Sequence, residues 1–459
     1  MKKNAVNHFE KNYDSFLEEM NEFLAIPSVS TDPEHEDDVQ AAAGYLAQKL
    51  TAIGMENVTV FQTNRHPIVY ADYLHAGAAE PTILIYGHYD VQPEDPIDLW
   101  DTPPFTPTVI GDHLYARGAS DMKGQVFACI AAIQSIKETS NLPVNIKFIL
   151  EGEEEIGSPN LPKFLEEHVA LLKADCALNT DAGMLGKNLP SITYGLRGLA
   201  YFELRLFGPN RDLHSGSYGG VVHNPAQVLV DLLSKMHDEN GRVTLEGFYN
   251  DVLTLSETER NNLAMHSPSD EEFKTQLGVA ALWGEAGFTP VERQGARPTL
   301  EINGILSGFA GKGSKTIIPA QAMAKISTRL VPNQNPEKIF FMLDSFIKKN
   351  LPPTVRYELD QLSTGFPSIS DTNLPDAQAL TLAFRDVWGV EPALKREGGS
   401  VPVVADMQKI LGIDSVLTGF GLPDDRIHSP NEKLDLPTWR KGVHVLIHFF
   451  FNSHEVRSE

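Results

Sequence analysis

Apolar residues recur every three or four positions in several parts of the chain, a spacing that predicts amphipathic helices. Residues 9–24 show it clearly, with Phe9, Phe16 and Phe23 on one face and Pro27 just beyond the end. The same spacing predicts helices at residues 39–53, 121–137, 161–172, 224–237, 336–349 and 438–451.

Short apolar runs lie between the first of these helices and predict buried strands. They cover residues 58–62, 68–73, 82–86, 144–150 and 176–179. Because a connection between two parallel strands crosses over in a right-handed sense, the alternation predicts an α/β fold, a mostly parallel sheet with helices on both faces.

The pattern changes near residue 190. Residues 191–207 alternate apolar and polar side chains over a long stretch, which predicts a half-buried strand, and the first pattern returns only near the end of the chain. We therefore predict one α/β domain made from residues 1–190 and 395–459, with an α+β domain, residues 191–394, inserted between them.

Composition narrows the choice of ligands. The 459 residues carry 61 acidic and 38 basic side chains, a net charge of −23, and 42% of the residues are hydrophobic. Such a surface repels nucleic acid and anionic membranes, and it is compatible with metal cations and small zwitterions. We expect no nucleic-acid or membrane partner.

The cysteines and the chain ends bear on location. Cys129 and Cys176 lie in apolar stretches and do not make a disulfide framework, which favours a reducing compartment. The first residues are polar, so no signal peptide is predicted, and the apolar run at 443–451 is too short to span a bilayer. We expect a cytoplasmic protein.

The first candidate site residues, His88 and Asp90, come just after the predicted strand 82–86. Residues two apart on an extended segment face the same side. His88 can bind a metal through one ring nitrogen, while Asp90 holds the other N–H and fixes the tautomer. The alternative is a buried structural histidine beside an aspartate that forms a turn.

Asp121 is the second candidate, at the junction of a glycine-containing loop and the predicted helix 121–137. Taken alone, this position is typical of a helix N-cap, because an aspartate side chain accepts hydrogen bonds from the first N–H groups of a helix.

Four acids, Glu151, Glu153, Glu154 and Glu155, crowd the end of the predicted strand 144–150. Carboxylates this close repel one another and do not all ionise without cations nearby. A solvated charge run is the usual explanation of such a sequence. Here, however, an apolar strand delivers the acids to the carboxyl edge of the sheet, where parallel sheets place their sites.

Asp181 follows the strand 176–179, and His428 lies in a polar loop before the last helix. With the earlier candidates they give two histidines and three carboxylates, a set that suits two metal ions of the zinc type sharing one carboxylate. Paired metals can activate a shared water, and a further carboxylate, Glu154, can act as the general base.

The order of these motifs resembles the two-metal aminopeptidase-like amidohydrolases, a family that includes carnosinase, cytosolic non-specific dipeptidase, acetylornithine deacetylase and succinyl-diaminopimelate desuccinylase. The motifs are His-x-Asp at 88–90, Gly-x-Ser-Asp-x-Lys-Gly at 118–124, Glu-Glu-x-Gly-Ser at 154–158, Asp181 and the late His428. The segments that most resemble the dipeptidase branch are 212–216, 315–319, 329–332 and 396–402. The resemblance implies a catalytic domain of the zinc-exopeptidase type with an inserted lid and dimerisation domain.

The resemblance also implies the metal ligands. His88 and Asp181 would hold one ion, and Glu155 and His428 the other. Asp121 would bridge the two. We expect two divalent ions per subunit, zinc or manganese, with cobalt also tolerated by these ligands.

Two further roles follow from the same resemblance. Glu154 would be the general base, and Asp90 would orient His88. The family often has a cis peptide after the bridging aspartate, here the bond between Asp121 and Met122.

In the inserted domain the resemblance implies residues that bind substrate. His214 would stabilise the developing oxyanion, accompanied by Thr316, and in the family this histidine reaches into the site of the neighbouring subunit, which implies a homodimer through the inserted domain. Arg329 would bind the substrate carboxylate through its planar fork. Gly399 and Ser400 would line the pocket. The alternatives are a loop histidine that caps a turn and, for Arg329, an ion pair on the strand surface.

One departure concerns specificity. Eukaryotic dipeptidases carry a Ser-His-Pro-His stretch where this chain reads Asn373-Leu374-Pro375-Asp376. Leu374 therefore replaces a histidine that contacts substrate in the family, which argues against a preference for carnosine.

The sequence thus predicts a metallopeptidase acting on dipeptides with a free C-terminal carboxylate. An N-acyl-amino-acid deacylase with the same machinery is the nearest alternative, because the two differ only in what fills the pocket opposite Arg329. A non-catalytic metal-binding protein is a remoter alternative, and the presence of Glu154 argues against it.

Overall fold

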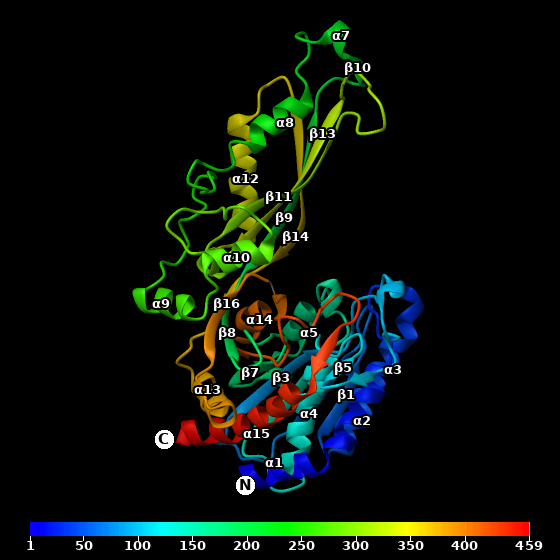
Figure 1. Cartoon of the computed structure of the whole chain (residues 1–459), viewed down its shortest axis with the longest axis vertical. Helices are drawn as coiled ribbons and strands as arrows, with labels where there is room; N and C mark the ends of the chain where they lie inside the picture. The colour runs from blue at the N-terminus through cyan, green and yellow to red at the C-terminus, as the bar shows by residue number, and fades with distance from the viewer. Residues whose placement is uncertain (400, 459) are drawn as a thin grey trace. The chain divides into compact units, whose positions relative to one another are not determined.

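The computed structural model describes residues 1–399 and 401–458 and divides the chain into two compact units. The first unit holds Met1–Tyr194, Ser370–Lys395 and Asp406–Glu459, and the second holds Gly195–Ile369 and Arg396–Ala405. The colours of Figure 1 follow the chain out of the first unit into the second and back. Residues 370–395, which the sequence pattern assigns to the inserted domain, group with the first unit, where helix α13 (Pro375–Trp388) packs against α15 (Leu436–Ser458).

Six strands of one sheet form the centre of the first unit, in the order β1-β2-β6-β3-β7-β17. Their bounds are β1 Glu56–Phe61, β2 Ile68–Tyr73, β3 Thr82–His88, β6 Asn145–Glu151, β7 Cys176–Asn179 and β17 Ser415–Leu417. The strands β6, β3, β7 and β17 pair in parallel, whereas β1 and β2 add an antiparallel edge. This edge is antiparallel because a short turn, not a crossover helix, joins β1 to β2. The predicted α/β class is confirmed.

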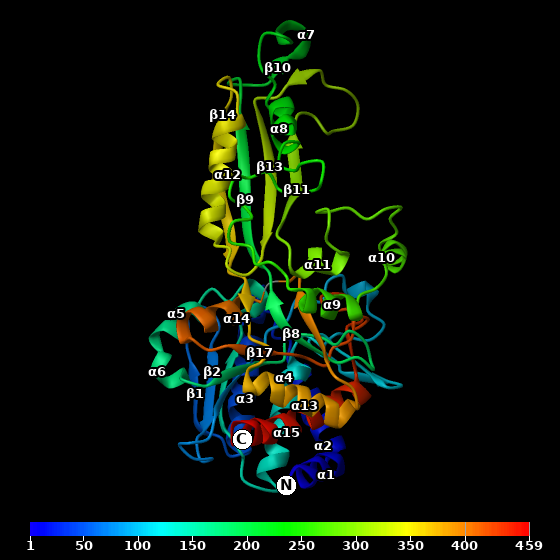
Figure 2. The ribbon, with the colours of Figure 1, turned by 90° about the vertical axis from the view of Figure 1, so that its left-hand side faces the viewer.

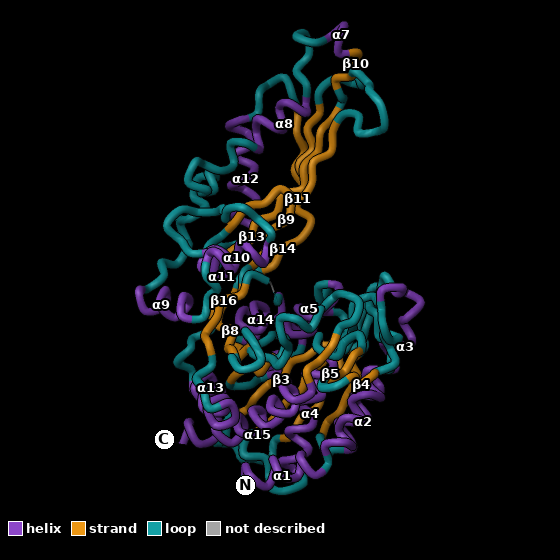
Figure 3. Tube along the Cα trace, viewed as in Figure 1, coloured by secondary structure: helices purple, strands orange, loops and turns teal. Residues whose placement is uncertain are grey.

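The alternation of side chains along β6 shows that both faces of this sheet are covered. Ile146, Phe148 and Leu150 belong to the main hydrophobic core, together with side chains of α4 (Lys123–Lys137). Lys147 points to the opposite face, where its Nζ donates to the carbonyl of Leu171 at 2.6 Å, in the short helix α6 (Val169–Leu172). Figures 2 and 3 show the helices around the strands of this unit. The other helices of the unit are α1 Lys2–Lys11, α2 Tyr13–Leu24, α3 Glu36–Ala52 and α5 Leu161–Glu167.

Helix α4 begins two residues later than the sequence pattern predicts. Met122 occupies its N-cap position, and no side chain caps the helix. The interpretation of Asp121 as a helix cap is therefore wrong, which leaves its carboxylate for other contacts. A small antiparallel sheet lies beside this segment and orders its strands as β18 (Lys433–Asp435), β5 (His113–Tyr115) and β4 (Thr108–Ile110).

The second unit is built on an antiparallel sheet in the order β11-β13-β9-β14. The predicted strand 191–207 is in fact two strands interrupted at Arg197, β8 (Ser191–Leu196) and β9 (Gly198–Phe207), and of these β9 belongs to this sheet. The other strands of the sheet are β11 Thr299–Ser307, β13 Gln321–Leu330 and β14 Arg356–Gly365. Helix α8 (Pro225–Leu233) packs against β13 and β9, and α12 (Pro336–Asn350) packs against β9 and β14. Together they bury a separate core.

The remaining α-helices and strands are short. They are α7 Ser215–Tyr218, α9 Glu257–Met265, α10 Asp270–Leu277, α11 Pro290–Gly295, α14 Pro402–Asp406, β10 Leu213–His214, β12 Ile317–Ile318, β15 Ser368–Ile369 and β16 Ala393–Glu397. In the part of the chain that the structure describes, no helix has both the length and the apolar character needed to cross a bilayer.

Candidate metal centre

Neighbouring parallel strands of the first unit end side by side at the candidate site. His88 is the last residue of β3 and pairs with Glu151, the last residue of β6. On the other side of β3, Tyr86 pairs with Asn179, which ends β7. The loops that follow these strands therefore start from one edge of the sheet, as expected for sites of parallel sheets.

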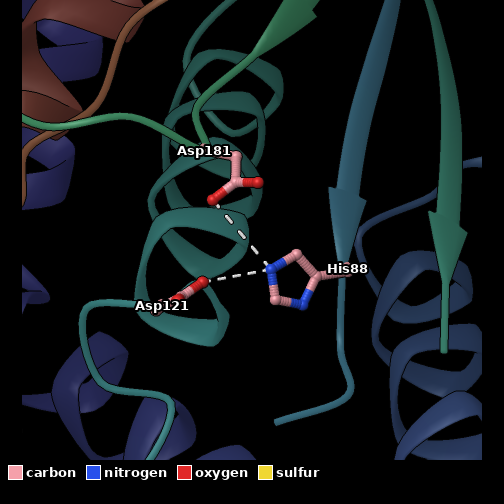
Figure 4. Close-up of side chains that lie close together, drawn as sticks. All are labelled: His88, Asp121 and Asp181. Atoms are coloured by element: carbon pink, nitrogen blue, oxygen red, sulfur yellow. Dashed lines mark hydrogen bonds and ion pairs between the residues drawn. The ribbon is translucent and has the colours of Figure 1, made fainter. Parts of the chain in front are cut away.

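Two groups of possible metal ligands share Asp121. One group is His88, Asp121 and Asp181, which Figure 4 shows, and the other is Asp121, Glu155 and His428. Within each group the ligand atoms lie within 4.8 Å of one another. The structure thus brings together all five residues that the sequence singled out as ligands.

Asp121 lies between the two histidines. Its Oδ1 is 3.1 Å from Nε2 of His88, and its Oδ2 is 2.9 Å from Nε2 of His428. On the outer sides, Nε2 of His88 lies 4.0 Å from Oδ1 of Asp181, and Nε2 of His428 lies 3.3 Å from Oε2 of Glu155. The peptide bond after Asp121 is cis, as the resemblance implied.

Asp90 contacts His88 mainly through its backbone. Nδ1 of His88 lies 3.0 Å from the carbonyl oxygen of Asp90 and 3.5 Å from its carboxylate. The carboxylate instead accepts the backbone N–H groups of Glu154 at 3.2 Å and of Glu155 at 3.0 Å. Asp90 therefore fixes the turn that carries these two acids, and its backbone carbonyl is the nearer partner of the His88 ring.

The four acids after β6 divide into two kinds. Glu151 accepts hydrogen bonds from the hydroxyls of Tyr86 at 2.7 Å and Ser158 at 2.9 Å. Glu153 accepts the backbone N–H of His66 at 2.8 Å and the side-chain amide of Asn160. Both acids are thus held by their own donors, and the two acids that follow them are the ones that face the candidate site.

Glu154 joins the site through a third group of ligand atoms, which consists of His88, Glu154 and Glu155. Burial raises the pKa of Glu154 to about 9, and the surrounding carboxylates, Asp181 first among them, oppose the lowering effect of His88. The predicted base therefore lies beside a predicted ligand, in surroundings that strengthen its hold on a proton.

Protonation of the histidines reflects the same crowding of carboxylates. Burial alone would lower the pKa of His88, but hydrogen bonds with carboxylates, Asp121 first, raise it well above its usual range. Hydrogen bonds to Asp121 and Glu155 raise the pKa of His428 to about 10. The cluster of carboxylates thus favours the protonated, positively charged form of both histidines.

The residues present fit divalent metal ions. Oε1 of Glu155 is buried and has no hydrogen-bond partner among the described residues, so it has an unused acceptor that a cation can take. Imidazole nitrogens and carboxylate oxygens are the ligands that zinc and related metals accept in proteins.

The segment that carries Asp181 packs closely against the residues after β17. A Cβ atom on Gly419 would lie 1.6 Å from the carbonyl oxygen of Ala182, a separation that only glycine permits. The backbone N–H of Met184 donates to the carbonyl of Gly421 at 2.8 Å. Asp181 is therefore held by a contact between the first and last parts of the unit.

Sequence reasoning did not assign a role to two residues at the site. Nε2 of Gln92 donates to Oε2 of Glu155 at 2.8 Å. Glu432 accepts a hydrogen bond from the backbone N–H of Asp121 at 3.1 Å. Both lie within a few residues of a predicted ligand histidine, which was the only available signal.

The predicted substrate residues belong to the second unit. His214 is exposed in β10 and pairs with Ile317 of β12, next to Thr316, while Arg329 is the penultimate residue of β13. Gly399 is exposed, and Ser400 lies outside the described residues.

His214 and Arg329 lie near opposite ends of β13. Asp212, two residues before His214, accepts the N–H of Ala320, which immediately precedes this strand. Arg329 stands eight residues beyond the first residue of the strand, a span of about 25 Å at the rise of an extended chain. Figure 1 shows β10 beyond that far end of β13. A single subunit therefore does not bring these two residues together.

Comparison with known proteins places the chain in a family. The peptidase family M20/M25/M40 matches residues 84–452. The Cys-Gly metallodipeptidase dug1 of Schizosaccharomyces pombe is 33% identical to this chain, over 98% of this chain and 97% of the relative. The human Beta-Ala-His dipeptidase is 32% identical, over 96% of this chain and 91% of the relative.

A solved structure agrees with these sequences. The M20 family metallo-carboxypeptidase Sso-CP2 from Sulfolobus solfataricus has a TM-score of 0.85 and 36% identity, over 96% of this chain and 99% of that one. The similarity covers nearly the whole of both chains and so includes both units. As the order of its motifs predicted, the chain belongs to peptidase family M20/M25/M40.

Proposed function

We propose that the protein is a metal-dependent dipeptidase that hydrolyses the amide bond of dipeptides with a free C-terminal carboxylate. The observation that carries the proposal is the pair of ligand groups that share Asp121. In these groups His88 and Asp181 would hold one divalent ion, and Glu155 and His428 the other. Relatives of nearly equal length, named as a metallodipeptidase and a dipeptidase, support the choice of reaction.

Glu154 is the base in this proposal. Divalent ions bound here would supply Lewis acidity that activates water and polarises the substrate carbonyl. Glu154 takes a proton from the attacking water on its carboxylate and passes it to the nitrogen of the leaving amine. Its raised pKa supports this role, because positive charge nearby lowers a carboxyl pKa from about 9 towards the range where the group both accepts and donates a proton.

The second unit supplies the contacts to substrate. Arg329 binds the substrate carboxylate, and Gly399 and Ser400 line the pocket. His214, with Thr316 beside it, stabilises the oxyanion. Because β10, which carries His214, lies near the start of β13 and Arg329 lies about 25 Å further along that strand, a site that uses both draws them from two subunits. We therefore propose a homodimer formed through the inserted unit.

Zinc or manganese is the expected metal, and cobalt suits the same ligands. The two cysteines, Cys129 and Cys176, are free and buried, which supports a reducing compartment and hence the cytoplasm.

An N-acyl-amino-acid deacylase would use the same ligand groups, and the experiment must separate the two activities. The purified protein is stripped of metal, reloaded with Zn²⁺ or Mn²⁺, and assayed with Cys-Gly, β-Ala-His, other dipeptides, and N-acetyl and N-succinyl amino acids. We expect hydrolysis of dipeptides, with β-Ala-His cleaved poorly because Leu374 replaces a histidine. Turnover of acyl substrates alone would assign a deacylase instead.

A further inference from the structure

A buried ion pair lies next to the ligand groups without belonging to them. Nη1 of Arg117 donates to Oε2 of Glu432 at 2.8 Å, and each side chain is only 1% exposed. Neither residue is a candidate metal ligand. Burying two charged side chains costs free energy unless other groups hydrogen-bond to them. The hydrogen-bond partners of this pair therefore show which segments of the chain it holds in place.

Glu432 organises the backbone that presents Asp121. Its Oε2 accepts the N–H of Gly118 at 3.1 Å as well as the guanidinium of Arg117. Its Oε1 accepts the N–H of Ser120 at 3.0 Å and of Asp121 at 3.1 Å. One carboxylate thus fixes the path of the loop up to the residue that both ligand groups share.

Arg117 extends the connection to the loop that follows His88. Its Nη2 donates to the carbonyl oxygen of Pro93 at 2.9 Å, and its guanidinium lies over the ring of Trp100, 5.3 Å from the ring centre. Glu432, in turn, follows His428 by four residues. The ion pair therefore links three loops, and each of these loops carries one ligand.

Resting on the proposed function, we propose that Arg117 and Glu432 are positioning residues that hold His88, Asp121 and His428 in the arrangement that binds both metal ions. Their pairing then determines metal affinity, and not only the stability of the fold. Asp121 is common to the two ligand groups, so loss of the pair weakens both ions.

The sign of the electrostatic effect supports this role. Glu432→Gln leaves the guanidinium of Arg117 buried without its counter-charge beside a site for cations, which opposes cation binding. It also turns an amide N–H₂ towards backbone N–H donors. Residues that orient metal ligands from behind typically change metal affinity 10–100-fold when replaced, and we expect a loss of about that size.

The second unit offers a matched control. Arg297 and Glu285 form another buried pair, with Nε to Oε2 at 2.7 Å and Nη2 to Oε1 at 2.8 Å. Neither residue lies in a candidate ligand group. Glu285→Gln therefore breaks a comparable ion pair without touching the loops that carry ligands.

The test measures metal binding by the metal-free protein. Wild type, Glu432→Gln, Arg117→Lys and Glu285→Gln are titrated with Mn²⁺ or Zn²⁺ in a calorimeter, and thermal unfolding of each metal-free protein is recorded. We expect Glu432→Gln to bind metal about 10–100-fold more weakly. Arg117→Lys keeps the positive charge but loses the planar guanidinium and its several donors, so it should also weaken metal binding. Glu285→Gln should lose thermal stability and bind metal like the wild type.

Three other results would overturn the inference. It is overturned if both variants of the Arg117–Glu432 pair fold and bind metal within twofold of wild type. It is also overturned if Glu285→Gln loses as much metal affinity as Glu432→Gln, or if neither Glu432→Gln nor Arg117→Lys folds, since the pair would then serve the fold alone. A wild-type protein that binds no divalent metal would contradict the proposed function itself.

Discussion

Oδ2 of Asp121 lies 2.9 Å from Nε2 of His428, a residue that the chain supplies only after the inserted unit. Burial would raise the pKa of Asp121, but hydrogen bonds with His428 and His88 hold it well below its usual range. The same contact is the first cause of the raised pKa of His428, about 10. In the proposed site, a metal ion bound by His428 would therefore compete with a proton on the same imidazole.

Metal binding should therefore release protons. At neutral pH the imidazole of His428, whose pKa is about 10, is protonated, and a metal ion must displace that proton. We expect affinity to rise with pH up to about 10. Calorimetric titrations at one pH in buffers of different ionisation enthalpy measure the number of protons released. A binding heat that does not depend on the buffer would contradict this prediction.

The stability of the metal-free protein should fall as the pH rises. The pKa of His428 is raised from 6.5 to about 10, and that of Glu154 from 4.5 to about 9, so the folded protein keeps protons that the unfolded chain releases. The stabilisation by His428 is complete below pH 6.5, and that by Glu154 below pH 4.5; each is lost as the pH rises through the folded pKa. Thermal unfolding midpoints between pH 6 and about 10 test this trend. A midpoint for the metal-free protein that rises across this window would contradict it.

Glu154→Gln should abolish most of the activity and leave metal binding intact. Loss of a general base typically lowers kcat about 10²–10⁴-fold. Glu153→Gln is the matched control, because Glu153 accepts the backbone N–H of His66 and faces away from the ligand groups. The control should lose about 1–3 kcal/mol of unfolding free energy and keep its kcat. Full hydrolysis by Glu154→Gln would show that another group is the base.

Mixing two inactive variants should restore activity if the oxyanion histidine comes from the other subunit. His214→Ala and Glu154→Gln each remove one component of every site. In a mixed dimer, one site receives Glu154 from the first subunit and His214 from the second. An equal mixture that exchanges subunits freely should regain roughly a quarter of the wild-type activity. The measurement is kcat after co-refolding, and a mixture no more active than its components would place His214 outside the partner's site.

Gly419→Ala should displace Asp181 and weaken metal binding. The new Cβ would lie 1.6 Å from the carbonyl oxygen of Ala182, so backbone must move. We expect a loss of at least about 2 kcal/mol in unfolding free energy, as for other overpacked sites. Gly44→Ala is the control, since a Cβ there meets nothing within 4 Å, and in helix α3 it should stabilise the protein by up to about 1 kcal/mol. Equal metal affinity in the two variants would contradict the prediction.

The fold class and the strand ends could be predicted from the sequence because both follow from local apolar patterns. The runs that end just before His88 and Asp181 form β3 and β7, and the sheet brings their ends together. For Asp121, its position at the start of a helical pattern gave a wrong prediction of its role. It sits where a cap would, but Met122 takes the cap position and the carboxylate contacts histidines supplied by other parts of the chain.

Long-range partners explain what the sequence could not predict. Nothing local separates Glu153 from Glu154, since the distinction depends on donors such as His66 and Asn160. In the same way, nothing in the sequence near Glu432 distinguishes it from the other acidic residues. Its role depends on the N–H groups of Ser120 and Asp121, which are distant in the sequence and donate to its carboxylate.

The split of the first unit sets the order in which the site can form during synthesis. His88, Asp121, Glu155 and Asp181 leave the ribosome before the inserted unit, whereas His428 and Glu432 follow it. A nascent chain therefore contains all the residues of one candidate ligand group, His88, Asp121 and Asp181, long before it contains those of the second. In the proposed site, both metal ions can bind only after the last part of the chain has been made, and a chain that stops inside the inserted unit lacks both His428 and Glu432.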